Sequence, residues 1–141
     1  MSTGSCLCGR VRFEIDGELT APGYCHCASC RKSTGSAFAA GALARARDLR
    51  WLAGLDAVAS HARPDDDLHH YFCRECGASL MTAPEGASDP AGLGDGRVGV
   101  HLGCLDGHPP LRPGRHLHVA QKAPWYDILD ELPRYRALPE S

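Results

Sequence analysis

The sequence predicts a mainly β protein built as a single domain. The chain has 141 residues, which is the length of one ordinary domain and too short for two well-packed ones. Several short segments alternate apolar and polar residues with a period of two, as half-buried strands do. These segments recur at short intervals, which is typical of all-β domains. We therefore expect one domain over residues 1–141.

The first predicted strand covers residues 11–15, where Val, Phe and Ile alternate with Arg and Glu and the pattern stops at Asp16-Gly17. The same reasoning predicts six further short strands. They cover residues 38–43, 57–61, 68–72, 79–82, 98–102 and 116–120.

Two other segments are predicted near the end of the chain. Trp125, Ile128, Leu129 and Leu132 follow the i, i+3, i+4, i+7 spacing of one helix face after Pro124, so we expect a short C-terminal helix that ends before Pro133. Residues 83–96 are rich in Gly and Pro and have no periodicity, which predicts a long surface loop.

Composition excludes some functions and favours a compartment. Fifteen Lys and Arg against seventeen Asp and Glu give a formal charge of -2, which counts against nucleic-acid binding through phosphates. No apolar run approaches the roughly twenty residues that span a bilayer, so we expect no membrane partner. The first residues do not resemble a secretory signal, and we expect a cytoplasmic protein. In a reducing cytosol, clustered cysteines are metal ligands or redox centres more often than disulfides.

Seven of the eight cysteines fall into three clusters, and Cys104 stands alone. Cys73 and Cys76, followed by Gly77, have the spacing of a zinc knuckle, which supplies two ligands. A tetrahedral structural zinc needs four ligands, and Cys6 with Cys8 supplies the other two. The sequence therefore predicts one closed zinc site.

The middle cluster offers three thiols, from Cys25, Cys27 and Cys30, which leaves one tetrahedral position open at a second zinc. Three thiolates favour a soft incoming ligand, so the pattern indicates a thiol substrate. Two alternatives stay open. His26, His116 or Cys104 could complete a second structural zinc and make the chain a binding module, or the Cys-x-x-Cys pairs could serve a thiol-redox protein.

These motifs, in their order, resemble the glutathione-dependent formaldehyde-activating family, also called the centromere-protein-V-like family. The resemblance covers about residues 4–136. It is carried by residues 4–9, 25–32 and 72–77, by Leu105-Asp106, by His116 and by Pro124-Trp125. It implies a β-tent fold with two zincs per chain, with Cys6, Cys8, Cys73 and Cys76 as the structural ligands and Cys25, Cys27 and Cys30 as the catalytic ones.

The resemblance also implies a carbon-sulfur lyase, of the S-(hydroxymethyl)glutathione synthase type. A small thiol such as glutathione would bind the open zinc as a thiolate and attack formaldehyde. His26, Arg31 or His116 could donate to the developing alkoxide, and Arg31 and Lys32 could hold the carboxylates of glutathione. Nothing in the sequence sets the oligomeric state.

Overall fold

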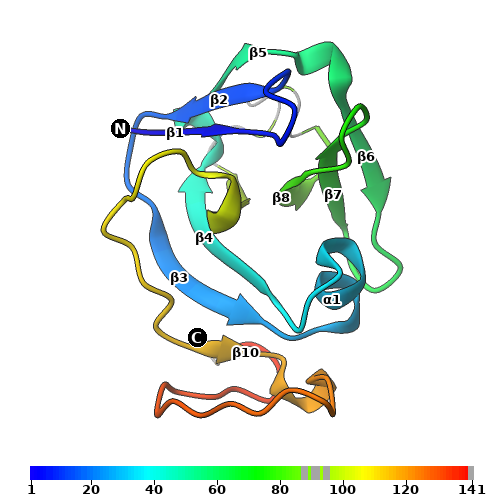
Figure 1. Ribbon diagram of the computed structural model, residues 1–141, viewed down its shortest axis with the longest axis vertical. Coiled ribbons are helices and arrows are strands. Elements are labelled where there is room, and N and C mark those ends of the chain that lie inside the picture. The colour runs from blue at the N-terminus through cyan, green and yellow to red at the C-terminus, as the bar shows by residue number, and fades with distance from the viewer. Residues whose placement is uncertain (87–88, 90–92, 94–95, 140–141) are drawn as a thin grey trace.

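The strands of the protein form two sheets (Figure 1), as seen in a computed structural model that describes residues 1–86, 89, 93 and 96–139. A three-stranded sheet has the order β1-β2-β5, and a seven-stranded sheet has the order β10-β3-β4-β9-β8-β7-β6. All neighbouring strands are antiparallel except β10 and β3, which are parallel. The strand bounds are β1 Ser2–Ser5, β2 Arg12–Ile15, β3 Thr20–Cys25, β4 Ala39–Arg45, β5 Leu49–Ala53, β6 Val58–Ala62, β7 Leu68–Cys73, β8 Ser79–Pro84, β9 Arg97–His101 and β10 His116–Leu117.

Helical structure is scarce among the described residues. One α-helix has described bounds, α1 at Ala28–Thr34, and four 3-10 turns are also present among the described residues. The turns cover Ala46–Asp48, Leu55–Ala57, Leu102–Cys104 and Val119–Gln121. The mainly β prediction is therefore confirmed.

Each predicted strand overlaps an observed one, although the last is shorter than expected. Residues 116–120 form a strand over two residues, because His118 has a positive φ of 55° and starts a 3-10 turn. Three observed strands lack the alternation that predicts a strand: β1 has no apolar side chain, Pro22 and Gly23 interrupt β3, and β5 loses its alternation after Trp51. In the predicted loop over 83–96, residues 87–88, 90–92 and 94–95 lie outside the described residues, and strand β8 continues to Pro84.

The predicted C-terminal helix is wrong. Residues 125–132 contain no helix, and two members of the expected apolar face, Trp125 and Leu129, are exposed. The Arg134 guanidinium donates to the backbone oxygens of Ile128 and Asp130, so these carbonyls have partners that a helix would otherwise supply. Residues 133–137 instead pair in extended form with the β10 region, as the hydrogen bond from Tyr135 N to His116 O shows. Tertiary hydrogen bonds therefore override the local helical pattern.

The main core packs side chains of the small sheet against the large one. Phe13 and Ile15 from β2 are fully buried together with Val98 and Val100 of β9. The Phe13 ring lies over Gly4 of β1, where a Cβ atom would approach the ring to 2.2 Å. Phe13 therefore holds the two N-terminal strands against the core.

Among the described residues, no helix has both the length and the apolar character needed to cross a membrane.

Replacing Phe13 by Ala should lower the free energy of unfolding by about 3–5 kcal/mol, because a fully buried aromatic ring is lost and a cavity is left. Urea denaturation of the metal-loaded protein measures the change. Leu52→Ala, at an exposed position of β5, is the control and should change stability by less than about 0.5 kcal/mol. Equal losses in the two variants would contradict this packing.

Candidate metal centres and thiol cavity

Two turns at distant points of the chain bring four cysteine thiols together. Cys6 and Cys8 lie in the connection between β1 and β2, whereas Cys73 ends β7 and Cys76 follows it. Each turn closes in the same way, with the backbone N–H of its first cysteine donating to a carbonyl five residues later. Gly9 and Gly77 follow the second cysteine of each pair with φ near +79° and +78°, a conformation that favours glycine. The two turns therefore form a matched pair of knuckles.

The four sulfur atoms, which lie within 4.8 Å of one another, have the spacing of a tetrahedral metal site. Zinc-sulfur bonds of about 2.3 Å in a tetrahedron place the sulfurs roughly 3.8 Å apart. The Sγ atoms of Cys6 and Cys8 are 3.5 Å apart, and those of Cys8 and Cys73 are 3.9 Å apart. The Ala78 backbone amide lowers the pKa of the Cys76 thiol to about 6, which favours the thiolate that a metal binds. The donor set fits one metal ion.

The second cluster contains Cys25, Cys27 and Cys30, whose sulfurs also lie within 4.8 Å of one another. Cys25 ends β3, Cys27 caps α1 and Cys30 lies in its first turn. The Cys27 Sγ accepts a hydrogen bond from Cys30 N at 3.3 Å, so the helix cap positions one cysteine relative to the other. Among the described residues, no fourth His, Cys, Asp or Glu joins this group. The cluster can therefore hold a metal and leave one position for another ligand.

An arginine that the sequence analysis did not select lies against this cluster. Arg63, in the connection between β6 and β7, donates from Nη2 to Cys27 Sγ at 3.4 Å, and its side chain is 9% exposed. The Cys25 and Cys30 side chains hold the pKa of Cys27 far below its ordinary value, and the Cys30 amide and Arg63 lower it further. Negative charge is thus concentrated on Cys27 and is partly offset by a buried guanidinium.

A cavity of about 270 Å³ opens beside the three thiols. The residues that line it include Cys25, Cys30, Arg63 and Arg115, which immediately precedes β10. His101, at the end of β9, also lines it and contacts the Ser79 carbonyl oxygen through Nδ1 at 3.2 Å. Since a carbonyl can only accept, Nδ1 carries the proton and the neutral ring keeps Nε2 as a proton acceptor.

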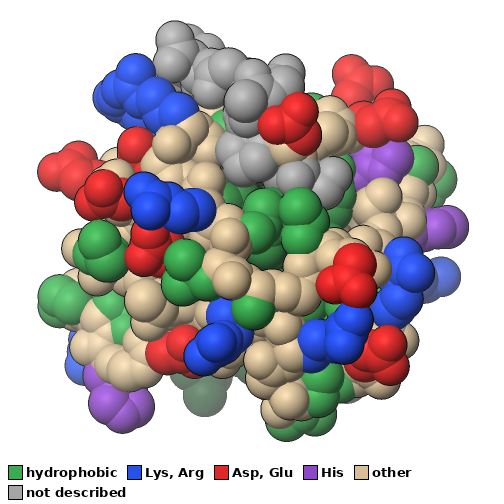
Figure 2. All heavy atoms as spheres, turned by 90° about the horizontal axis from the view of Figure 1, so that it is seen from above, with side chains coloured by type: hydrophobic (Ala, Val, Ile, Leu, Met, Phe, Trp, Pro, Cys, Tyr) green, Lys and Arg blue, Asp and Glu red, His purple; other side chains and the backbone are tan. Residues whose placement is uncertain are grey.

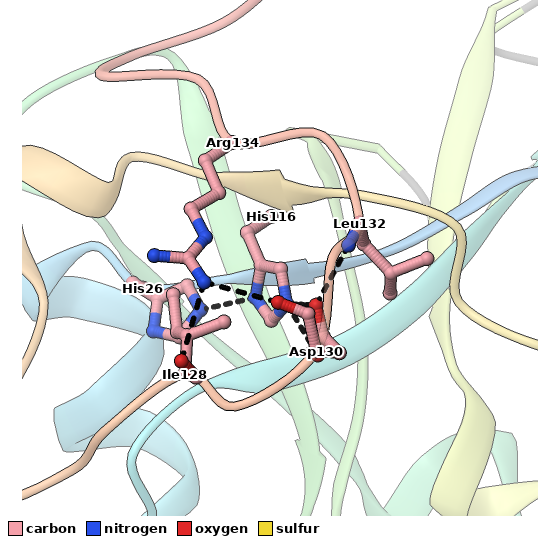
Figure 3. A network of polar contacts seen from close by, with 6 residues as sticks. All are labelled: His26, His116, Ile128, Asp130, Leu132 and Arg134. Atoms are coloured by element: carbon pink, nitrogen blue, oxygen red, sulfur yellow. Dashed lines mark hydrogen bonds and ion pairs between the residues drawn. The ribbon is translucent and has the colours of Figure 1, made fainter.

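The rings of His26 and His116 contact each other (Figure 3). Adjacent residues of an extended segment point to opposite faces, so His26 is directed away from its neighbours Cys25 and Cys27. His26 is 0% exposed and its Nε2 lies 2.8 Å from Nδ1 of His116, which is 1% exposed. His116 Nε2 donates to the Asp130 carboxylate at 3.0 Å. Neither histidine lines the thiol cavity.

This chain of contacts fixes how the two rings are protonated when both are neutral. The Asp130 carboxylate only accepts, so His116 carries its proton on Nε2 and accepts from His26 at Nδ1. Burial, followed by the charge of His116, lowers the pKa of His26 to about 4, which keeps that ring neutral at pH 7. Through these contacts, the C-terminal segment stabilises the backbone between Cys25 and Cys27.

The other predicted residues lie around the cluster rather than in the cavity. Lys32, on α1, lines a neighbouring cavity of about 370 Å³ that Arg63 also borders, and Arg31 does not line either cavity.

Cys104 donates from its thiol to the Ser79 carbonyl at 2.9 Å, and burial raises its pKa to about 11. Asp106 of the Leu-Asp pair accepts from Ser5 Oγ at 2.7 Å, which fastens β1 to the turn after β9. Arg63, Arg115 and Asp130 were missed because nothing in their local sequence marks them.

Comparison with known proteins places the chain in a family. A model of the glutathione-dependent formaldehyde-activating enzyme family matches residues 1–121. The chain belongs to this family. A provisionally named glutathione-dependent formaldehyde-activating enzyme of Halomonas elongata is 28% identical over 131 residues, which covers 89% of this chain and 79% of the relative. A crystal structure of a Rhodobacter sphaeroides protein matches 77% of this chain and 91% of its own with 30% identity and a TM-score of 0.58. Family membership thus confirms the resemblance seen in the cysteine motifs.

Replacing Asp130 by Ala should lower the free energy of unfolding, because the buried His116 Nε2 loses its acceptor. Chemical denaturation at pH 7 measures the change. Asp127→Ala removes an exposed acid from the same segment and should have little effect. If the two variants are equally stable, the carboxylate does not anchor the histidine pair.

Acidification should destabilise the protein partly through His101, because burial lowers its pKa in the folded state. In the unfolded chain the pKa of a histidine is about 6.5, so below this pH the unfolded chain binds a proton at His101 that the folded protein does not bind. The free energy of unfolding therefore falls as the pH drops toward the lower pKa of His101 in the folded protein. His101→Gln should therefore lose less unfolding free energy than the wild type between pH 7.5 and 5.5. His108→Gln, at an exposed histidine, is the control and should keep the wild-type slope.

Proposed function

We propose that the chain is a zinc-dependent carbon-sulfur lyase that joins a small thiol, such as glutathione, to formaldehyde. Cys25, Cys27 and Cys30 would hold the catalytic zinc, and the four-cysteine cluster would hold a structural one. One observation carries this proposal: the three-thiol cluster has no fourth ligand among the described residues, and two of its members line a cavity. Glutathione is a cytosolic thiol, so the proposal also implies a cytoplasmic protein.

The donor sets support zinc at both clusters. Thiolates are soft ligands, and sulfur donors in tetrahedral spacing favour zinc over magnesium, calcium or manganese. Four cysteines satisfy a structural zinc completely, whereas three leave the open position that catalytic zinc sites keep.

The proposed reaction needs no oxidant or reductant. Bound at the three cysteines, zinc would hold the incoming thiol as a thiolate at neutral pH. The substrate sulfur attacks the carbonyl carbon of formaldehyde, a carbon-sulfur bond forms, and the π electrons of the C=O bond move to oxygen, which takes up one proton. The cavity beside Cys25 and Cys30 positions the two reactants, and Arg63 offsets the negative charge at Cys27. We assign His101 Nε2 as the acceptor that takes the thiol proton and returns it to the oxygen.

The alternative of a binding module with two structural zincs finds less support. The three residues that could complete a second closed site have other partners: His26 pairs with His116, and Cys104 donates to a backbone carbonyl. On the face seen in Figure 2, basic and acidic side chains are interspersed and form no large area of one sign. That distribution does not favour a polyanionic partner.

Cobalt substitution combined with glutathione titration tests the open site. The wild-type protein should bind two cobalt ions, and one of them should gain a new thiolate charge-transfer band as glutathione is added. Cys30→Ser should lose that response, whereas Cys104→Ser, at a cysteine outside both clusters, should keep it. Two bound metals with no response to any thiol would instead support the structural module.

Exchange spectroscopy with ¹³C-formaldehyde and glutathione tests the reaction itself. The wild-type protein and Cys104→Ser should speed formation of the S-hydroxymethyl adduct above the uncatalysed rate, and Cys30→Ser should not. If the wild type binds glutathione but leaves this rate unchanged, a formaldehyde reaction is excluded and another electrophile must be sought.

A further inference from the structure

The thiol cavity has an apolar end, around Leu43 and Gly99, that the formaldehyde reaction does not use. Formaldehyde has two heavy atoms, and its reaction with a thiol needs only the cysteine cluster and a proton acceptor. Most residues that line the cavity are nevertheless small or apolar, and they include Leu43, Leu68, Leu117 and Leu138. Apolar surface gains free energy when it leaves water, so this end of the cavity indicates an apolar ligand.

The strand register places the apolar end well away from the thiols. Ala39, Gly41 and Leu43 follow one another on one face of β4, because side chains alternate along a strand, and all three line the cavity. Ala39 lies opposite Cys25 of β3, whereas Leu43 lies opposite Gly99 of β9. Four strand residues span about 13 Å. The cavity therefore extends from the thiols past Gly41 to Leu43.

The space at the apolar end depends on the absence of a side chain at Gly99. Apart from its chain neighbours, a Cβ atom there would have one described neighbour within 4 Å, the Thr82 carbonyl oxygen at 3.4 Å. The Thr82 hydroxyl contacts His70 Nδ1 at 3.4 Å, so this polar group has a partner within the protein. The floor of the apolar end is therefore open and can lie against an alkyl chain.

The charged and titratable side chains of the lining lie nearer the thiols. His101 lies opposite Gly41, between the cysteine cluster and the apolar end. The Arg63 guanidinium contacts a thiol of the cluster and a neighbouring carboxylate, so its charge is already compensated. The Arg115 side chain lies over Gly23, the β3 residue opposite Gly41. The cavity thus has a polar, reactive end and an apolar end.

We propose that the apolar end holds the alkyl group of an aliphatic aldehyde, so that the protein joins thiols to aldehydes larger than formaldehyde. This proposal rests on the proposed function, because the nucleophile is the thiol held at Cys25, Cys27 and Cys30. The substrate sulfur attacks the carbonyl carbon, a carbon-sulfur bond forms, and the π electrons of the C=O bond move to oxygen. That oxygen takes up the proton that His101 removed from the thiol. With the oxygen directed to His101, the alkyl group extends toward the apolar end.

The size and polarity of the cavity limit the aldehyde class. At about 270 Å³ the cavity lies just below the 300–1,000 Å³ of typical small-molecule pockets. We therefore expect short, unbranched aldehydes such as butanal. Glyceraldehyde is a polar aldehyde of similar size, and its hydroxyl groups would lose water at the apolar end without gaining partners there.

Methyl NMR on the zinc-loaded, full-length protein with labelled leucines tests binding without turnover. 1-Butanol is an unreactive analogue of butanal, and it should shift the methyl signals of Leu43 and Leu117. The signal of Leu52, which is exposed and outside the cavity, should stay in place. Methanol at the same concentration should shift none of the three, because it has no alkyl chain to reach the apolar end.

Proton exchange spectroscopy with glutathione and a series of aldehydes tests the reaction. The ratio of kcat/KM to the uncatalysed rate constant should rise about fourfold for each methylene added between acetaldehyde and butanal, as expected for burial of alkyl groups. The ratio for glyceraldehyde should lie at least about tenfold below that for butanal.

Two substitutions should shift the preferred chain length in opposite directions. Gly99→Ala places a methyl group in the apolar end, so it should weaken 1-butanol binding and lower the butanal-to-formaldehyde rate ratio, each at least about tenfold. Leu43→Ala enlarges the same end and should move the preference from butanal toward hexanal. Gly103→Ala is the matched control, because this glycine is exposed, lies outside the cavity and has no described atom within 4 Å of an added Cβ. It should behave as wild type.

The outcomes separate the larger aldehydes from the formaldehyde reaction. Acceleration of formaldehyde without butanal, or unchanged 1-butanol binding in Gly99→Ala, overturns the assignment of the apolar end and leaves the proposed function standing. Acceleration of butanal alone supports the larger aldehydes and excludes formaldehyde. Failure to accelerate any aldehyde overturns both proposals.

Discussion

The convergence of two cysteine knuckles joins the two sheets of this protein. Cys6 and Cys8 follow the first strand of the small sheet, and Cys73 and Cys76 come at the end of β7 in the large one, 65 residues beyond Cys8. The core beneath them uses many alanines and few aromatic residues, so apolar burial per residue is modest. A metal held by the four thiolates, as proposed above, would add its binding energy to the folding energy and close this long loop. The proposed metal would therefore add a second link between the sheets to the packing of Phe13 and Ile15 in the core.

A second constraint acts where β3 meets α1. Cys25, His26 and Cys27 follow one another, and the alternation of an extended chain sends the thiols and the imidazole to different faces. One face carries the three-thiol cluster, and the other carries the buried contact with His116 and Asp130 (Figure 3). These three residues thus supply two thiols of the cluster and connect it to the C-terminal segment, which runs beneath β3 and β10 in Figure 1. The cap at Cys27 then positions Cys30, whose backbone N–H donates to Cys27 Sγ.

Two arginines from distant parts of the chain lie beside the three-cysteine cluster and offset its negative charge. Arg63 comes from the β6–β7 connection and Arg115 from the segment before β10, so strands on both sides of the large sheet contribute cations to one cavity. A three-thiolate zinc is a weaker Lewis acid than one with neutral ligands, and a guanidinium bonded to Cys27 Sγ withdraws some of that excess negative charge. In the proposed function, the three thiolates would favour binding of a substrate thiolate over activation of water.

The sequence by itself determined the residues of both cysteine clusters and their division into four and three. Thiol spacings of one or two residues have few geometric outcomes, so a short motif predicts its local structure. Most strands followed from their alternation for the same local reason. Only the tertiary structure decided the rest: Arg63, Arg115 and Asp130 carry no local signal, and the helical spacing after Pro124 is overruled by Arg134 and by pairing with β10. Hydrogen bonds and ion pairs between residues far apart in the sequence depend on how strands are ordered in space, and one chain's pattern of apolar and polar residues does not encode that order directly.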